Sequence, residues 1–154
     1  ERLPQAKVKP ALALSLHTTC ADLRAQLLPH AQRIDPAELV ELGEAYARAT
    51  GYPIQYQWTL LEGINDSAEE VDGIAKLLAG KYAVMNLIPY NAVDGLGFSR
   101  PAQESAEAMS LALYRRGILT KLRQSAGQDI DGGCGQLRAR ALTKAYRPDP
   151  TGAA

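Results

Sequence analysis

The sequence has few cysteines, no excess of charge of either sign and no long apolar run. Cys20 and Cys134 are its only cysteines in 154 residues, too few for a disulfide framework, so a reducing, cytoplasmic location is the simplest expectation. Its 17 basic and 17 acidic residues cancel, which argues against nucleic-acid capture by the charge of the whole domain. No apolar run approaches the roughly 20 residues of a membrane helix. The first residues also lack the apolar core of a signal peptide, so we expect no membrane contact.

The composition that remains is typical of one folded domain. Hydrophobic residues make up 46% of the chain and charged residues 22%, which excludes intrinsic disorder for most of its length. A domain of this size can bury roughly 70% of the surface that its unfolded chain exposes. We expect residues 1–140 to form the domain, and the basic, then proline- and glycine-containing tail at 141–154 to be frayed.

The charged residues are distributed unevenly along the chain. Acidic residues dominate from Glu38 to Asp72, and basic residues dominate from Arg115 onward. A basic stretch of this kind can form an edge that faces a polyanion, or it can simply be part of a solvated surface with mixed patches. Charge alone favours the solvated surface.

Segments typical of strands and helices alternate along the chain. We expect strands at 8–16, 54–61, 82–88 and 118–123, with helices at 21–28, 35–50, 67–79 and 101–116. The first strand is interpreted as buried because both of its faces are apolar. Asp35 and Ser67 are each placed to cap a helix, and Leu39, Val40, Leu42 and Tyr46 are expected on one buried helical face. The alternation predicts an α/β fold with a parallel sheet and helices packed outside it.

A polar cluster follows every expected strand. The clusters are Ser15-Leu16-His17, Glu62 to Asp66, Pro89-Tyr90-Asn91 and the loop that leads to Cys134. Ligands of parallel sheets gather at the carboxyl ends of the strands, so these clusters predict one shared site. Within it, Asn65 and Asp66 are interpreted as a turn and a helix-start device. Because the sheet would begin abruptly and leave open edges, we interpret it as part of a larger barrel that can self-associate through those edges.

Five segments carry a resemblance to a known family, in order and with family-like spacing. They are LALSLH at 12–17, LR with LLP at 23–29, LLEGINDS at 60–67, NLIPYN at 86–91 and DIDGGCGQL at 129–137. Together they resemble the C-terminal half of the radical SAM RNA adenine-C2 methyltransferases (RlmN/Cfr-like). The resemblance implies a parallel βα half-barrel, the C-terminal part of the partial, TIM-like (βα) barrel of that family.

The resemblance also implies two cofactors and an RNA substrate. The family binds S-adenosyl-L-methionine to a 4Fe-4S cluster, which is held by a CxxxCxxC motif. This chain has no CxxxCxxC, so we expect no metal ligand here and place the cluster ligands in an N-terminal half that the chain does not include. The implied activity is methylation of adenine C2 in ribosomal RNA through a methyl-cysteine intermediate, with transfer RNA as a second candidate.

Individual residue roles follow from the same resemblance. Cys134, flanked by glycines, matches the cysteine that carries the methyl group, whereas Cys20 has no family counterpart. Ser15, Leu16, His17 and Asn91 match residues that contact S-adenosylmethionine. Taken without the resemblance, these residues also fit a small free cysteine, a strand cap with a satisfied histidine, which is the commoner case, and a turn asparagine.

One segment departs from the family pattern and leaves other functions open. Where the family commonly has Thr-Arg-Gly-Asp, the chain has Ser125-Ala126-Gly127-Gln128, just before the cysteine segment. A related radical SAM enzyme with another substrate is therefore one alternative. A half-barrel without catalysis, acting in RNA binding or assembly, is another.

Overall fold

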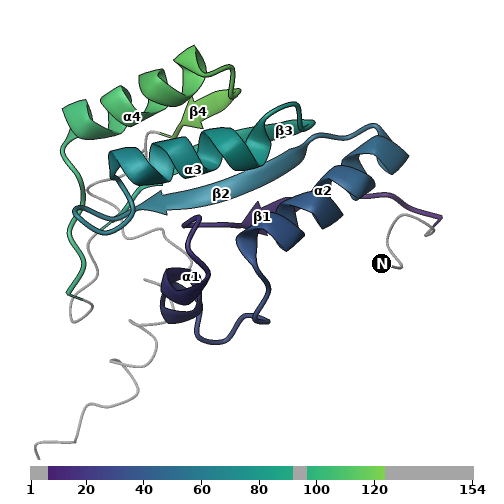
Figure 1. Cartoon of the computed structure of the whole chain (residues 1–154), viewed down its shortest axis with the longest axis horizontal. Helices are drawn as coiled ribbons and strands as arrows, with labels where there is room; N and C mark the ends of the chain where they lie inside the picture. Colours follow the sequence, from purple (N-terminus) through teal and green to yellow (C-terminus); the bar gives the residue numbers. More distant parts are fainter. Residues whose placement is uncertain (1–6, 92–96, 124–154) are drawn as a thin grey trace, which may run out of the picture.

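The computed structural model describes residues 7–91 and 97–123 (Figure 1). Four parallel strands form one sheet in the order β1-β2-β3-β4. The strands are β1 (Ala13–Ser15), β2 (Ile54–Leu60), β3 (Ala83–Pro89) and β4 (Thr120–Leu122). The helices between them are α1 (Ala21–Leu27), α2 (Pro36–Thr50), α3 (Ala68–Leu78) and α4 (Gln103–Arg115). The predicted α/β fold with a parallel sheet is confirmed.

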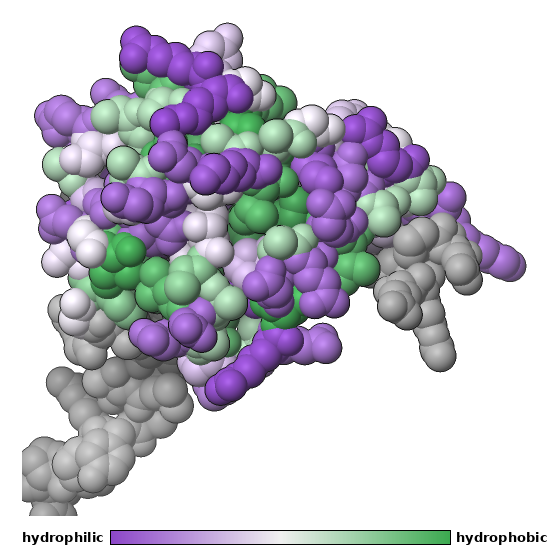
Figure 2. Space-filling view, viewed as in Figure 1, coloured by the Kyte–Doolittle hydropathy of each residue, from purple (hydrophilic) through white to green (hydrophobic). Residues whose placement is uncertain are grey.

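Helices α2, α3 and α4 lie side by side over one face of the sheet (Figure 1). Parallel neighbours cannot be joined by tight turns, so each connection crosses over the sheet and carries a helix. In the same view, Figure 2 shows polar side chains spread over this helical layer, with apolar patches between them. In the described segments, no helix combines the length and the apolar character needed to span a bilayer.

The core lies between the sheet and this helical layer. Residues along β2 alternate between buried and half-buried, which is the period of a strand with one face on the core. Tyr56 and Trp58 are fully buried on the core side, where Ile74 of α3 and Leu113 of α4 are also fully buried. The strand therefore has a dry face toward the helices and a more polar face on the other side.

Helix boundaries follow the caps expected from the sequence. The side chain of Asp35 accepts a hydrogen bond from the Ala37 amide at 2.8 Å, and Ser67 accepts one from the Glu70 amide at 3.3 Å. Gly51 ends α2 in the left-handed region, at a φ of 77°. The side chain of Glu70 extends from α3 to the segment that precedes α1. There its carboxylate accepts hydrogen bonds from the Thr19 amide at 2.8 Å and from the Thr19 hydroxyl at 2.5 Å.

Two expectations about burial were wrong. The first strand is not a long buried strand, because β1 has three residues, its pattern is largely exposed, and Val8 is 77% exposed. This strand pairs with β2 alone among the described strands, and the preceding segment is held to α2 by Tyr46, whose hydroxyl donates to the Pro10 carbonyl at 2.6 Å. Leu42 is 46% exposed, because α2 packs through Val40, Tyr46 and other residues on the opposite side.

One row of residues across the sheet is polar in every strand. Strand register pairs Ser15 with Gln57, Gln57 with Asn86 and Asn86 with Lys121. Residues paired in register point to the same side of a sheet. Gln57 lies on the side of β2 opposite the helices, so the whole row belongs to that side. Asn86 is fully buried and donates to the Gln55 side chain at 3.1 Å.

Candidate functional site

The segments that follow β1, β2 and β3 meet at the carboxyl edge of the sheet. Asn65 after β2 donates from its side chain to the His17 carbonyl after β1 at 2.7 Å. The Tyr90 amide after β3 donates to the Leu60 carbonyl at 3.1 Å. The structure thus brings together three of the four polar clusters predicted from the sequence. The fourth, the loop that leads to Cys134, lies outside the described residues.

His17 turns the chain sharply where β1 ends. Its φ is 62°, in the left-handed region that residues with a side chain rarely occupy. The surrounding contacts hold this conformation, since the Thr59 amide donates to the imidazole Nδ1 at 2.9 Å while Asn65 holds the carbonyl. Because the Thr59 amide holds the imidazole and the Asn65 side chain holds the carbonyl, the side chain of His17 has a defined position at the edge of the sheet.

The imidazole of His17 is neutral at physiological pH. Burial, reinforced by the nearby positive charge of Arg24, lowers the pKa of His17 from 6.5 to about 4. Because Nδ1 accepts the Thr59 amide, the ring proton resides on Nε2. His17 therefore offers one N–H donor, in a fixed direction, to whatever binds beside it.

Asn65 is the residue that sequence reasoning missed. It lies in the turn after β2, as expected, but it is fully buried and its side chain makes three hydrogen bonds to backbone groups. It accepts from the Leu61 amide at 2.8 Å and donates to the Thr59 carbonyl at 2.8 Å as well as to His17. Its own carbonyl accepts from the Trp58 indole at 3.2 Å. Asn65 thus joins the end of β2 to the histidine, a role that no local pattern indicates.

A cavity of about 180 Å³ opens beside the imidazole of His17. It is lined by His17, Leu27, Leu28, Thr59, Leu61, Tyr90 and Phe98. The rings of Tyr90 and Phe98 meet edge to face, with their centroids 6.0 Å apart. Pockets for whole drug-sized ligands span roughly 300–1,000 Å³, so this one suits a single flat or apolar part of a larger ligand.

The other residues expected at the site occupy different positions. Ser15 is the last residue of β1 and is exposed. Leu16 is a fully buried core residue, and its amide donates a hydrogen bond to the Gln57 carbonyl at 3.0 Å. Asn91 follows Tyr90 at the same edge, and its Oδ1 accepts from Arg100 at 2.7 Å. Of the four, His17 alone lines the cavity.

Two expectations concern cysteines and metal ligands. Cys134, the Ser125–Gln128 segment and the tail at 141–154 lie outside the described residues. Cys20 is exposed at the start of α1. In segments 7–91 and 97–123, no group of three or more His, Cys, Asp or Glu side chains is placed to hold a metal ion, so these segments do not fit an iron–sulfur cluster.

A parallel sheet with helices on one face and a largely apolar cavity at its carboxyl edge defines part of a (βα) barrel. No protein-family model matches the chain. The chain is 71% identical over 154 residues to a probable RNA methyltransferase of Aromatoleum aromaticum, covering 100% of this chain and 44% of that protein. It is 74% identical over 142 residues to a probable RNA methyltransferase of Methylibium petroleiphilum, covering 92% of this chain and 40% of that protein.

A solved structure gives the corresponding match in three dimensions. A radical SAM methyltransferase from Sphaerobacter thermophilus superimposes with a TM-score of 0.81 at 36% identity, over 88% of this chain and 40% of that one. The chain spans less than half the length of the relatives it matches. It is homologous to part of these methyltransferases, and its resemblance to the radical SAM methyltransferases is confirmed in sequence and in fold.

Proposed function

We propose that this chain is part of a radical SAM methyltransferase that modifies RNA. The observation that carries the proposal is the neutral, rigidly held His17 beside a partly aromatic cavity at the carboxyl edge of the sheet. Identity of 71% with a probable RNA methyltransferase over the whole chain supports both the enzyme class and the substrate class. Residues 1–140 form the barrel segment in this proposal.

The proposed cofactor at this edge is S-adenosylmethionine. The residues proposed to contact this cofactor are Ser15, Leu16, His17 and Asn91. Among them, His17 offers an imidazole N–H donor and Asn91 offers a side-chain amide. The apolar walls of the cavity fit a flat or apolar portion of the cofactor and exclude water from it. When bound, S-adenosylmethionine supplies the methyl group and the radical chemistry that side chains cannot. The 4Fe-4S cluster of the proposed enzyme has no ligand set in the described residues, so no role is assigned to them around it.

The proposed reaction is methylation of adenine C2 in ribosomal RNA, with Cys134 as the residue that first accepts the methyl group. C2 lies between two ring nitrogens and is electron-poor, so it does not attack a sulfonium methyl group directly, and a carrier with radical chemistry is required. Gly132, Gly133 and Gly135 flank the cysteine and allow its backbone to approach a ligand closely. Transfer RNA is the second candidate substrate.

One sequence feature favours a second candidate function. The Ser125–Gln128 segment lacks the arginine and the acid that the family commonly has before its cysteine segment. Loss of two charged groups beside the carrier favours a related radical SAM enzyme that acts on another substrate.

A full-length chimera tests both functions. In the chimera, this chain replaces the matching 44% of the Aromatoleum aromaticum relative, which is 71% identical. We expect the chimera to methylate adenine C2 in bulk ribosomal RNA, as measured by mass spectrometry of nucleosides. Cys134→Ala should abolish the product, whereas the matched control Cys20→Ala should retain it. Normal turnover by Cys134→Ala removes the carrier role, and cleavage of S-adenosylmethionine without RNA methylation favours the second function.

A further inference from the structure

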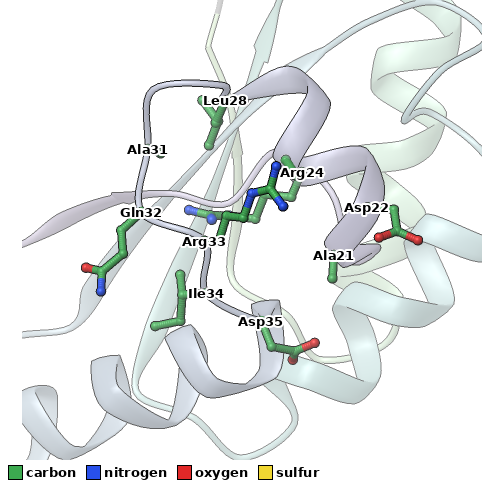
Figure 3. Close-up of a pocket in the computed structure, with 10 residues that line it drawn as sticks. Ala21, Asp22, Arg24, Leu28, Ala31, Gln32, Arg33, Ile34 and Asp35 are labelled. Carbon is green, nitrogen blue, oxygen red and sulfur yellow. The ribbon is translucent and has the colours of Figure 1, made fainter.

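A second cavity, of about 240 Å³, lies between α1 and the segment that leads into α2 (Figure 3). Its ionisable lining residues are two arginines, Arg24 and Arg33, and two aspartates, Asp22 and Asp35. It shares Leu28 as a wall with the His17 cavity, so the two are neighbours at the end of β1.

Arg24 is a buried guanidinium that is only partly satisfied. The residue is 7% exposed, and its Nη2 donates to the Ser15 carbonyl at 3.0 Å. Its Nε is buried and has no hydrogen-bond partner within the described segments. A buried charged donor without an acceptor is costly, because the lost hydration is not replaced. An acceptor that enters the cavity would remove this cost.

Arg33 adds a second guanidinium to the same cavity. Arg24 and Arg33 both line this cavity, and Figure 3 shows the carboxylates of Asp22 and Asp35 pointing away from the two arginine side chains. One oxygen of Asp35 already accepts from the Ala37 amide at the start of α2. Among the described residues, no ion pair involves either arginine. Two positive groups therefore line one cavity, and neither forms an ion pair with the acidic residues that the structure describes.

We propose that this cavity binds a phosphate group of the RNA substrate between Arg24 and Arg33. The proposal rests on the proposed function and adds a contact for the RNA backbone. Guanidinium groups present planar sets of donors that match phosphate oxygens, and the unpartnered Nε of Arg24 is one such donor. A polynucleotide carries one phosphate per nucleotide, so an RNA strand whose target base approaches the cofactor at the His17 cavity brings phosphates close to the neighbouring cavity.

The carboxylate of S-adenosylmethionine has similar chemistry, and two features favour the RNA phosphate. Arg33 is exposed and lies in the segment between α1 and α2, where a large ligand can reach it from solvent. The cavity is also separated by Leu28 from the His17 cavity, which is the part of the edge assigned to the cofactor.

The test measures RNA binding by the 154-residue chain, independently of methyl transfer. A short labelled single-stranded RNA is titrated by fluorescence anisotropy over a range of salt concentrations. Arg33→Ala should weaken binding about tenfold, because one charge-assisted contact is lost. It should also reduce the slope of log K against log salt by about 0.7, the value of one phosphate contact on a single strand. Arg33→Lys should retain part of the affinity and the full slope.

Arg48→Ala is the matched control. Arg48 lies in the last turn of α2, where it pairs with Glu44, and removing it takes away one positive charge far from the cavity. We expect less than a twofold change in RNA affinity for this variant, and circular dichroism should show that all variants fold.

Each other outcome overturns the inference in a distinguishable way. Equal RNA affinity and salt slope for Arg33→Ala and wild type would exclude the phosphate contact while leaving the proposed methyl transfer untouched. If Arg33→Ala weakens binding of inorganic phosphate or of S-adenosylmethionine but not of RNA, the cavity holds a free anion or the cofactor instead. If the wild-type chain binds no RNA at all, the assignment also fails, and the chimera assay decides separately on the enzyme.

Discussion

The backbone amide of Thr59 donates a hydrogen bond to Nδ1 of His17 at 2.9 Å, across the end of the first strand pair. This bond occupies the acceptor nitrogen of the imidazole and leaves the Nε2 proton as its free donor. It also ties the strained turn after β1 to β2, so the histidine is held by the sheet itself. This hydrogen bond therefore links the histidine after β1 to the neighbouring strand β2.

Protonation of His17 should destabilise the fold. Its pKa is about 4 in the folded chain and 6.5 when unfolded, so the unfolded state takes up a proton first as the pH falls. The neutral imidazole makes its full contribution to the free energy of unfolding above pH 6.5. This contribution is lost as the pH drops toward 4, and the loss is up to about 3 kcal/mol for a pKa shift of this size. Urea unfolding of the wild type between pH 7 and pH 4 measures the loss.

His17→Asn provides the control for this pH dependence. Asparagine tolerates positive φ, and its side-chain oxygen can accept the Thr59 amide, but it does not titrate. The variant should fold and should lose less stability than the wild type over the same pH range. Identical pH profiles for the two proteins would show that His17 does not have a depressed pKa.

Replacing Asn65 should loosen the site and destabilise the protein. Asn65→Ala removes a buried hydrogen bond to the Leu61 amide and two partly buried hydrogen bonds to the carbonyls of Thr59 and His17. We expect a loss of about 2–4 kcal/mol, because the backbone partners are left unsatisfied in the interior. The free energy of unfolding in urea gives the measurement.

The neighbouring aspartate is the comparison for Asn65. Asp66 accepts from the Gly63 amide at 2.9 Å, but this contact is exposed. Asp66→Ala should therefore cost less than about 1 kcal/mol. Equal losses for the two variants would mean that the turn as a whole, rather than the buried amide, stabilises this edge.

A glycine in α2 makes room for a tyrosine of β2. A Cβ at Gly43 would collide with the hydroxyl oxygen of Tyr56, which is buried beneath the helix. Gly43→Ala should destabilise the fold by about 1–3 kcal/mol, despite the better helix propensity of alanine. Thermal and urea unfolding measure the change.

Tyr56→Phe removes the colliding atom and should rescue Gly43→Ala. The tyrosine hydroxyl donates only a long hydrogen bond, 3.4 Å to the Val40 carbonyl, so the single Tyr56→Phe variant should lose little stability. The double variant should be at least as stable as Tyr56→Phe alone, and the double-mutant cycle would show favourable coupling. Additive losses would indicate that the two residues do not meet.

Features set by neighbours in sequence were predictable, whereas features set by distant contacts were not. The caps at Asp35 and Ser67 and the end of α2 at Gly51 depend on a few consecutive residues, and the structure confirms them. The burial of β1 depends on which segments pack against it. Apolar residues on both faces predicted a buried strand, whereas β1 is largely exposed in the structure. Leu42 is exposed although it belongs to the apolar face expected for α2, because a broad apolar face does not specify which of its residues contact the sheet.

The candidate site shows the same division. The motif at residues 15–17 and the sheet edge were predictable, because polar residues after parallel strands gather at one end. The left-handed turn at His17 and the buried amide of Asn65 were not, since each depends on partners roughly forty or more residues away. In the sequence, Arg24 is only part of a matching segment, and three-dimensional structure is needed to show that its Nε has no hydrogen-bond partner among the described residues.

The row formed by Ser15, Gln57, Asn86 and Lys121 gives the sheet two unlike sides. A layer of apolar side chains over this row would remove water from the Gln57 amide and the Lys121 ammonium group without replacing the lost hydrogen bonds. Whatever covers that side must itself carry donors and acceptors, whether solvent, ligand or further polypeptide. If this sheet is part of a barrel, the interior of that barrel would therefore contain water or other polar groups.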